Sequence, residues 1–227
     1  QSGLDEHGVF QHDQADRSML HNEENLDDDA LRDFGVDDGH GYTDGENTWR
    51  FIGTYLVYGQ WKQAVHGGIR KLAAAYAVSG DQAYSHKAGV LLDRVADLYT
   101  TFDFKEQAWM YEGPAHAGYV STWHDACEEA RELAIAYDQV REALDEDRDL
   151  ADFSSGKAKE HKIDIMKGSP RDVTRHIEEG ILRDTITNHE RIRSNYPRKE
   201  MALITIHTVL DWPNNKGDVH VMIDEMM

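Results

Sequence analysis

The sequence is poor in cysteine, in proline and in long apolar runs. Its single cysteine, Cys127, has no second thiol to pair with, so no internal disulfide can form. Only four prolines interrupt 227 residues, and 40% of the residues are hydrophobic, which is enough for a substantial core. No apolar run approaches the ~20 residues that a membrane-spanning helix needs. The sequence therefore predicts a chain that is held together by its own packing.

Positive charge is also scarce. Lysine and arginine number 24 against 43 aspartates and glutamates, a net charge of −19. The excess is concentrated in residues 1–48, which hold fourteen acidic and two basic residues. A surface this acidic excludes binding to a nucleic-acid backbone and disfavours anionic membranes, because both need clustered basic side chains. We therefore expect neither nucleic acid nor a membrane as a partner.

The residues after this acidic stretch show the hydrophobic pattern of helices. Apolar residues recur at helical spacing, and no alternating run with hairpin turns is present. Residues 1–48 are expected to form an acidic N-terminal arm. Helices are predicted over residues 49–79, 82–99, 119–144, 170–194 and 198–210 and from 217 onward, with a charged connector at 145–168. The expected class is all-α, with antiparallel helical hairpins stacked as in a toroid or solenoid.

Residues 109–137 (WMYEGPAHAGYVSTWHDACEEARELAIAY) carry the densest chemistry in the chain. Aromatic rings, imidazoles and carboxylates gather where a glycine-containing loop is expected to lead into a helix. They belong to Tyr111, Glu112, His116, Tyr119, His124 and Asp125. Rings can stack on sugar faces, and titratable groups can move protons. The stretch fits a sugar-processing cleft, and it fits a well-packed loop between helices equally well.

Four segments together resemble a known family. They are FGVDDGHGY…WRFIGTYLVYGQW, LAAAYAVSGDQAYSHKAGVLLDRVADLY, YVSTWHDACEEARELAIAYDQV and ILRDTITNHERIRSNYP. In this order they resemble the α/α-toroid domain of heparinase II/III-like polysaccharide lyases, over about residues 35–227. The resemblance implies an incomplete (α/α) toroid over residues 49–227, because the family continues with further helices, a tyrosine-bearing segment and a β-sandwich.

The resemblance also implies an activity. Such lyases cleave polysaccharides that contain uronic acids by β-elimination: a donor neutralises the sugar carboxylate, a base removes the C5 proton and a tyrosine protonates the leaving O4. The resemblance places the carboxylate donor at Asn195, for which a helix C-cap is the alternative. The other catalytic candidates are His124, His116 and Tyr119. The residues expected to bind substrate are Tyr58, Trp61, His66, Tyr111, Glu112, Trp123, Asp125, Arg193 and Tyr196, although an aromatic stripe such as Tyr58 and Trp61 also suits a core.

Two other functions stay open. A toroid glycoside hydrolase acting on uronides would use Glu112 and Asp125 as its pair of carboxylates. A non-catalytic helical scaffold would bind a glycan or a protein partner. We expect an anionic polysaccharide or oligosaccharide as the ligand and a bacterial periplasmic or secreted location. Self-association through the C-terminal helix is also expected, because Met222, Met226 and Met227 give it an apolar face.

No cofactor is expected. A divalent cation held by the N-terminal acids is the open alternative, since the loop 37–46 (DDGHGYTDGE) is rich in oxygen ligands but lacks the spacing of a calcium-binding loop. His12, His21 and His40 lie among the same acids and could also serve as ligands.

Overall fold

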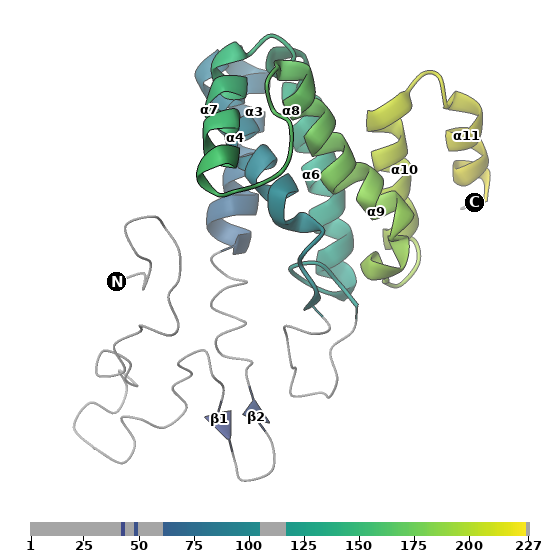
Figure 1. The fold of residues 1–227 in the computed structure, drawn as a ribbon. Helices are drawn as coiled ribbons and strands as arrows, with labels where there is room; N and C mark the ends of the chain where they lie inside the picture. Colours follow the sequence, from purple (N-terminus) through teal and green to yellow (C-terminus); the bar gives the residue numbers. More distant parts are fainter. Residues whose placement is uncertain (1–41, 44–47, 50–60, 105–116, 226–227) are drawn as a thin grey trace. The chain divides into compact units, whose positions relative to one another are not determined.

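The computed structural model describes residues 42–43, 48–49, 61–104 and 117–225. The contacts divide the chain into two units, and every helix described below belongs to the unit formed by Gln60–Gln107 and His116–Met227. The other unit contains strands β1 (Tyr42–Thr43) and β2 (Thr48–Trp49), which pair antiparallel (Figure 1). The sequence pattern did not predict this short hairpin. For the helical unit, the all-α class is confirmed.

The first helical hairpin follows the predicted boundary. One π-helical turn, η3 (Trp61–His66), leads into α3 (Gly67–Ser79). Gly80 then ends the helix in the left-handed conformation, with φ of 69°. The side chain of Asp81 accepts a hydrogen bond from the backbone N–H of Ala83 and so caps α4 (Gln82–Tyr99). The predicted stop and restart at 79–81 is confirmed.

Helix α6 (Trp123–Leu144) begins four residues later than predicted. Residues 118–122 form a tight turn instead, closed by an isolated bridge between Gly118 and Thr122. A side chain at Gly118 would place its Cβ 2.1 Å from the carbonyl oxygen of Ser121. Only glycine permits this close approach of the backbone.

The predicted connector at 145–168 is wrong over half its length, because it contains α7 (Arg148–Glu160). The Asp147 side chain accepts a hydrogen bond from the Leu150 N–H at 2.8 Å and caps this helix. Leu150, Ser154 and Ala158 lie on its buried face at intervals of four residues. The many charged neighbours hid this stripe from the sequence analysis.

The long helix predicted at 170–194 is a series of shorter pieces. They are α8 (Pro170–Ile177), the π-helical turn η4 (Glu178–Arg183), α9 (Asp184–Thr187) and the 3-10 turn η5 (His189–Ile192). The predicted start is confirmed, since Ser169 caps the helix and Pro170 occupies its first turn. A Cβ at Gly180 would lie 3.0 Å from the carbonyl oxygen of Ala96, so the π turn packs closely on α4.

Two helices follow Pro197, as predicted. Helix α10 (Arg198–Asp211) is succeeded by α11 (Lys216–Asp224). The last helix was expected to run to Met227 but ends at Asp224. Its side chains Val221 and Ile223 are exposed, and self-association through this face stays a prediction.

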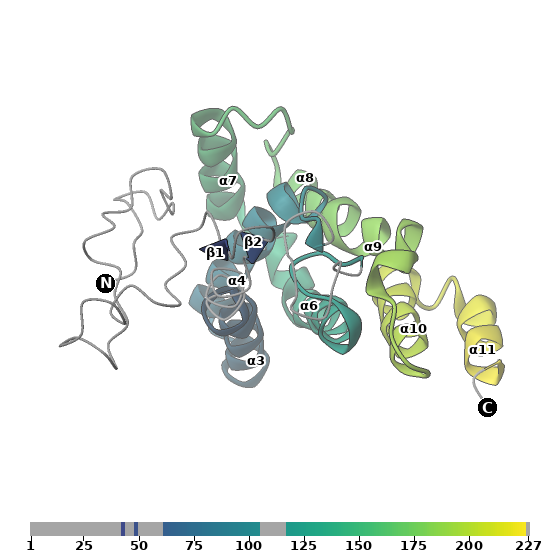
Figure 2. The ribbon, with the colours of Figure 1, turned by 90° about the horizontal axis from the view of Figure 1, so that it is seen from below.

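Helices α3, α6 and α10 lie side by side in one row (Figure 2). Helix α6 packs against α3 on one side and α10 on the other, while α4 packs on α3, α6 and α8. Small residues such as Ala96, Ala126 and Ala130 are fully buried where these helices meet, which lets the backbones approach closely. Among the described residues, no helix has both the length and the apolarity that a membrane span requires. Closure of the array into a toroid stays a prediction.

Candidate functional site at the start of helix α6

The start of α6 is held by an unusual backbone. Thr122 is extended, and Trp123 has φ of 54°, in the left-handed region that few residues other than glycine adopt. Such a conformation costs free energy and is found most often at functional sites. It leaves the indole of Trp123 exposed at the helix start, next to His124 and Asp125.

His124 contacts a segment that lies far along the chain. Its Nδ1 lies 2.6 Å from the hydroxyl oxygen of Ser194, seventy residues away. Ser194 directly precedes Asn195, so the predicted donor Asn195 and the predicted base His124 come to one place. Both side chains are exposed. Asn195 is not a helix C-cap, because η5 ends at Ile192.

The Ser194 hydroxyl has a second neighbour, the thiol of Cys127. Burial raises the pKa of Cys127 to about 11, and a hydrogen bond from Ser194 acts in the opposite direction. The thiol itself donates to the carbonyl of Ile192 at 2.8 Å. Cys127 is therefore a buried, unreactive thiol that helps to position Ser194.

Other exposed groups surround Asn195. Tyr196 follows it in the chain with 61% of its surface exposed, and Arg193 precedes it, paired with Glu190 at 3.2 Å. Tyr196 also borders a hollow of about 280 Å³ between α10 and α11, together with Glu200. The ring of Tyr196 and the guanidinium of Arg193 thus lie close to Asn195 in the chain, and their part in substrate binding stays a prediction.

Asp125 faces the other way, toward η3. Its carboxylate forms an ion pair with Lys62 at 3.2 Å, with both side chains half exposed. The neighbouring Trp61 packs edge-on against Phe102, with ring centroids 5.4 Å apart. Trp61 is thus a packing residue of this unit rather than an open sugar platform.

His66, predicted to bind substrate, is buried. Its Nε2 lies 3.4 Å from a carboxylate oxygen of Glu132, which also pairs with Arg70 at 3.0 Å. Burial, followed by the charges of Arg70 and Lys62, lowers the pKa of His66 to about 4. A neutral imidazole with 3% exposure is a core group and cannot contact a polysaccharide, so this assignment is withdrawn.

Tyr119, predicted to be catalytic, is also buried. Its hydroxyl donates to Asp184 at 2.6 Å, and its ring stacks on Tyr99 with centroids 4.0 Å apart. The guanidinium of Arg191 covers its other side, 4.2 Å from the ring centroid. Burial and the Asp184 carboxylate raise the pKa of Tyr119. With its proton held by Asp184 and its ring covered, Tyr119 is a structural residue here.

The sequence analysis missed one buried acid, Glu129. It lies one turn after Asp125 on α6, and burial raises its pKa to about 7. The Ser121 hydroxyl, the charge of Lys62 and the Trp61 N–H favour its charged form, yet its Oε1 is buried and has no hydrogen-bond partner among the described residues. The available signal was a charged residue among Ala126, Ala130 and Leu133 on the apolar face of the helix.

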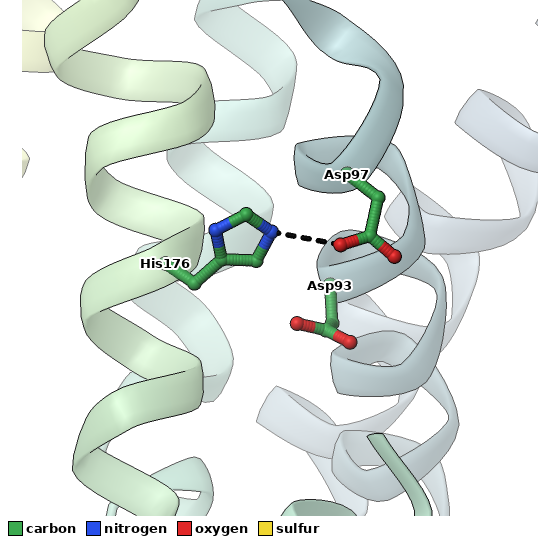
Figure 3. Close-up of side chains that lie close together, drawn as sticks. All are labelled: Asp93, Asp97 and His176. Carbon is green, nitrogen blue, oxygen red and sulfur yellow. Dashed lines mark hydrogen bonds and ion pairs between the residues drawn. The ribbon is translucent and has the colours of Figure 1, made fainter. Parts of the chain in front are cut away.

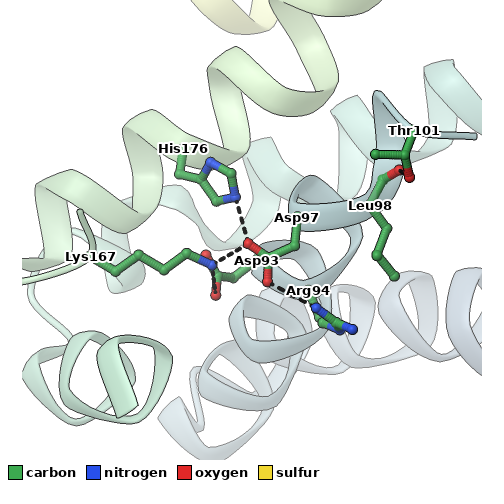
Figure 4. A network of polar contacts seen from close by, with 7 residues as sticks. All are labelled: Asp93, Arg94, Asp97, Leu98, Thr101, Lys167 and His176. Atoms are coloured by element: carbon green, nitrogen blue, oxygen red, sulfur yellow. Dashed lines mark hydrogen bonds and ion pairs between the residues drawn. The ribbon is translucent and has the colours of Figure 1, made fainter. Parts of the chain in front are cut away.

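A second polar cluster joins α4 to α8. Asp93, Asp97 and His176 each offer a ligand atom, and these atoms lie within 4.8 Å of one another, as metal ligands do (Figure 3). The ammonium of Lys167, however, lies 2.8 Å from Asp93 and 2.6 Å from Asp97 (Figure 4). It takes the position that a cation would hold.

The cluster is thus a buried ion-pair network. Lys167 is 1% exposed, His176 places its Nε2 3.0 Å from Asp97, and Arg94 pairs with the same carboxylate at 3.4 Å. Although burial acts to raise it, the pKa of Asp97 is lowered overall, because His176 and Lys167 donate hydrogen bonds to its carboxylate. The sequence analysis, which placed Lys167 in a connector, did not find this network.

The remaining predicted residues lie outside the described part of the chain. They are the candidate base His116, the substrate contacts Tyr58, Tyr111 and Glu112, and the candidate cation ligands among residues 1–41 and 44–46. No family model, no curated protein and no solved structure matches this chain.

Proposed function

We propose that this chain is a polysaccharide lyase, or part of one, which cleaves a uronate-containing polymer by β-elimination at the start of α6. We infer that its helical pairs form an arc of an (α/α) toroid. The observation that carries the proposal is the 2.6 Å contact between His124 and Ser194. It joins two segments, 70 residues apart, that were expected to supply the base and the carboxylate donor.

The hydrogen bonds around Ser194 favour one tautomer of His124. Ser194 has a single proton, and we place it toward the sulfur of Cys127, because a hydrogen bond from Ser194 lowers the pKa of that thiol. Its oxygen is then free to accept a hydrogen bond from Nδ1–H of His124. In that neutral tautomer Nε2 carries the lone pair, so Nε2 is the atom that can remove a proton. Ser194 is a positioning residue in this arrangement.

The reaction follows from this placement. Asn195 donates its amide N–H to the sugar carboxylate, which stabilises the negative charge that develops as C5 loses its proton. His124 Nε2 takes that proton, the C5 electron pair forms the C4–C5 double bond, and the bond from C4 to O4 breaks. Since Tyr119 is buried, the exposed phenol of Tyr196 is the group that protonates O4. The positive charges of Arg193 and Arg198 favour an anionic substrate locally on an acidic protein.

The test is a panel of uronate polymers, including alginate, heparan sulfate, chondroitin, hyaluronan, ulvan and pectate, at low and high salt. A lyase produces an ultraviolet-absorbing double bond without consuming water. We expect Asn195→Ala to lower the rate by at least about 100-fold and the exposed control Asn214→Ala to leave it unchanged. New reducing ends without the chromophore indicate the hydrolase, and binding without either product indicates the scaffold; each of these results contradicts the proposal.

A further inference from the structure

We propose that the groove between α3 and α6 binds an anionic oligosaccharide through Arg70, Lys71 and Arg131. The groove has a volume of about 380 Å³, within the range of small-molecule sites. This inference rests on the proposed function, because it names a second contact region for the same class of substrate. None of these three residues was predicted to bind a ligand.

The lining of the groove is basic on a protein that is strongly acidic. Arg70, Lys71 and Arg131 line it, with Glu132 as the one acidic residue among the lining side chains. Lys71 is exposed and forms no ion pair with any residue of the described ranges. A positive groove of this kind on a chain of net charge −19 concentrates anions locally.

The two arginines keep donors for a ligand. Arg70 pairs with Glu132 through one terminal nitrogen, and Arg131 pairs with Glu128 in the same way. A guanidinium has five N–H donors, so each side chain can hold its glutamate and still donate to a carboxylate or sulfate oxygen. The glutamates fix the arginines in place, which lowers the entropic cost of binding.

The rest of the lining suits a sugar ring. It includes Gly67 and Ala74 of α3 and Ala136 and Ile135 of α6. Small and apolar groups leave room for the flat face of a pyranose, and Ile135 is 39% exposed. A lining that combines apolar and basic groups matches a ring that carries a negatively charged substituent.

The groove continues the proposed catalytic site along α6. His124, Glu128, Arg131 and Ile135 are spaced by four, three and four residues, so they share one face of the helix. Glu128 links the two regions, since it pairs with Arg131 and lies 3.9 Å from Arg198, just after Asn195. His124 and Arg131 are about 10 Å apart along the axis, a separation that a short oligosaccharide spans.

The experiment measures binding without cleavage. The full chain carrying His124→Ala is titrated calorimetrically with hexamers of galacturonate, guluronate and a glucuronate-containing polymer, and with a neutral glucan hexamer. We expect at least one charged hexamer to bind at least about tenfold more tightly than the glucan. Adding Lys71→Glu should weaken that binding about tenfold and reduce its salt dependence. Lys71 is exposed, so this change leaves the fold intact.

Lys157→Glu is the matched control. Lys157 is half exposed on α7 and paired with Glu160, outside the groove, so its reversal should change affinity by less than about twofold. Three results overturn the inference. The two charge reversals weaken hexamer binding equally, the glucan binds as tightly as the charged hexamers, or no charged hexamer binds. If the double bond never forms yet Lys71-dependent binding is found, the lyase proposal fails and the groove stands. If cleavage depends on His124 but Lys71→Glu binds normally, the groove alone fails.

Discussion

Replacing Lys167 by methionine tests whether the α4–α8 network is held together by a buried ammonium. Methionine keeps the length of the side chain and removes the charge. The carboxylates of Asp93 and Asp97 would then lie side by side, with Arg94 and His176, which both contact Asp97, as the remaining positive partners in the network. Removing one partner of a buried ion pair costs about 3–5 kcal/mol. For a chain of this size that corresponds to a fall in Tm of about 6–20 °C.

The pH dependence distinguishes lost charge pairing from lost packing. In the native protein the lowered pKa of Asp97 contributes stability that is present above its unfolded pKa and is lost as pH falls through the folded value. In Lys167→Met that pKa should rise, so the penalty should be largest at pH 7 and shrink toward pH 4 as the carboxylates take up protons. Urea unfolding followed by circular dichroism at both pH values measures this. Lys157→Met, on an exposed side chain, should stay within about 0.5 kcal/mol. A penalty for Lys167→Met below 1 kcal/mol, or one that does not vary with pH, refutes the reasoning.

Two further predictions concern stability. The pKa of Glu129 is raised to about 7, so stability falls as pH rises from about 4.5 through 7. The pKa of His66 is lowered to about 4, so stability is lost as pH falls from 6.5 through 4. The two effects oppose each other between about pH 4.5 and 6.5, so the unfolding free energy should be nearly constant there and fall toward pH 4 and toward pH 7. Glu129→Gln should remove the decline toward pH 7, and an unchanged decline contradicts the assignment. Gly118→Ala should destabilise by more than about 2 kcal/mol, because its Cβ meets the Ser121 carbonyl, whereas Gly156→Ala on the open face of α7 should stabilise by about 0.5–1 kcal/mol. Thermal unfolding of the two variants checks both signs, and equal shifts would show that the turn tolerates a side chain.

Local signals in the sequence were enough to place several helix ends. Asp81 after Gly80 and Ser169 before Pro170 are side-chain caps and breakers whose effect depends only on their neighbours, and both boundaries are confirmed. Helix α7 was missed because most of its buried residues are small, such as Ser154 and Ala158, and give only a weak hydrophobic pattern among many charged neighbours. The division of 170–194 was missed for a different reason. The π turn at η4 packs closely on α4, and that contact is tertiary.

The site was predictable only in part. Residue types along 109–137 and the family resemblance selected His124 and Asn195. Whether these two residues lie close together depends on how the chain after η5 returns to α6. Ser194 makes the hydrogen bond to His124, but nothing in the sequence pattern marked Ser194 as a site residue. Tyr119 and His66 were assigned roles by residue type, and burial removed both from the accessible surface. Whether an aromatic or imidazole side chain faces solvent or the core is decided by helix packing, which one sequence does not specify.

The measurement that tests the central claim most directly is the rate of double-bond formation by three forms of the chain on the most reactive uronate polymer. The native chain and His161→Ala, an exposed histidine at the end of α7, should produce the ultraviolet chromophore at equal rates. His124→Ala should lose at least about 100-fold, and Ser194→Ala should lower the rate and alter its pH profile, since Ser194 fixes the tautomer of His124. A flat trace from folded native protein on every uronate polymer, or equal rates for His124→Ala and His161→Ala, would contradict the assignment of a lyase site at the start of α6.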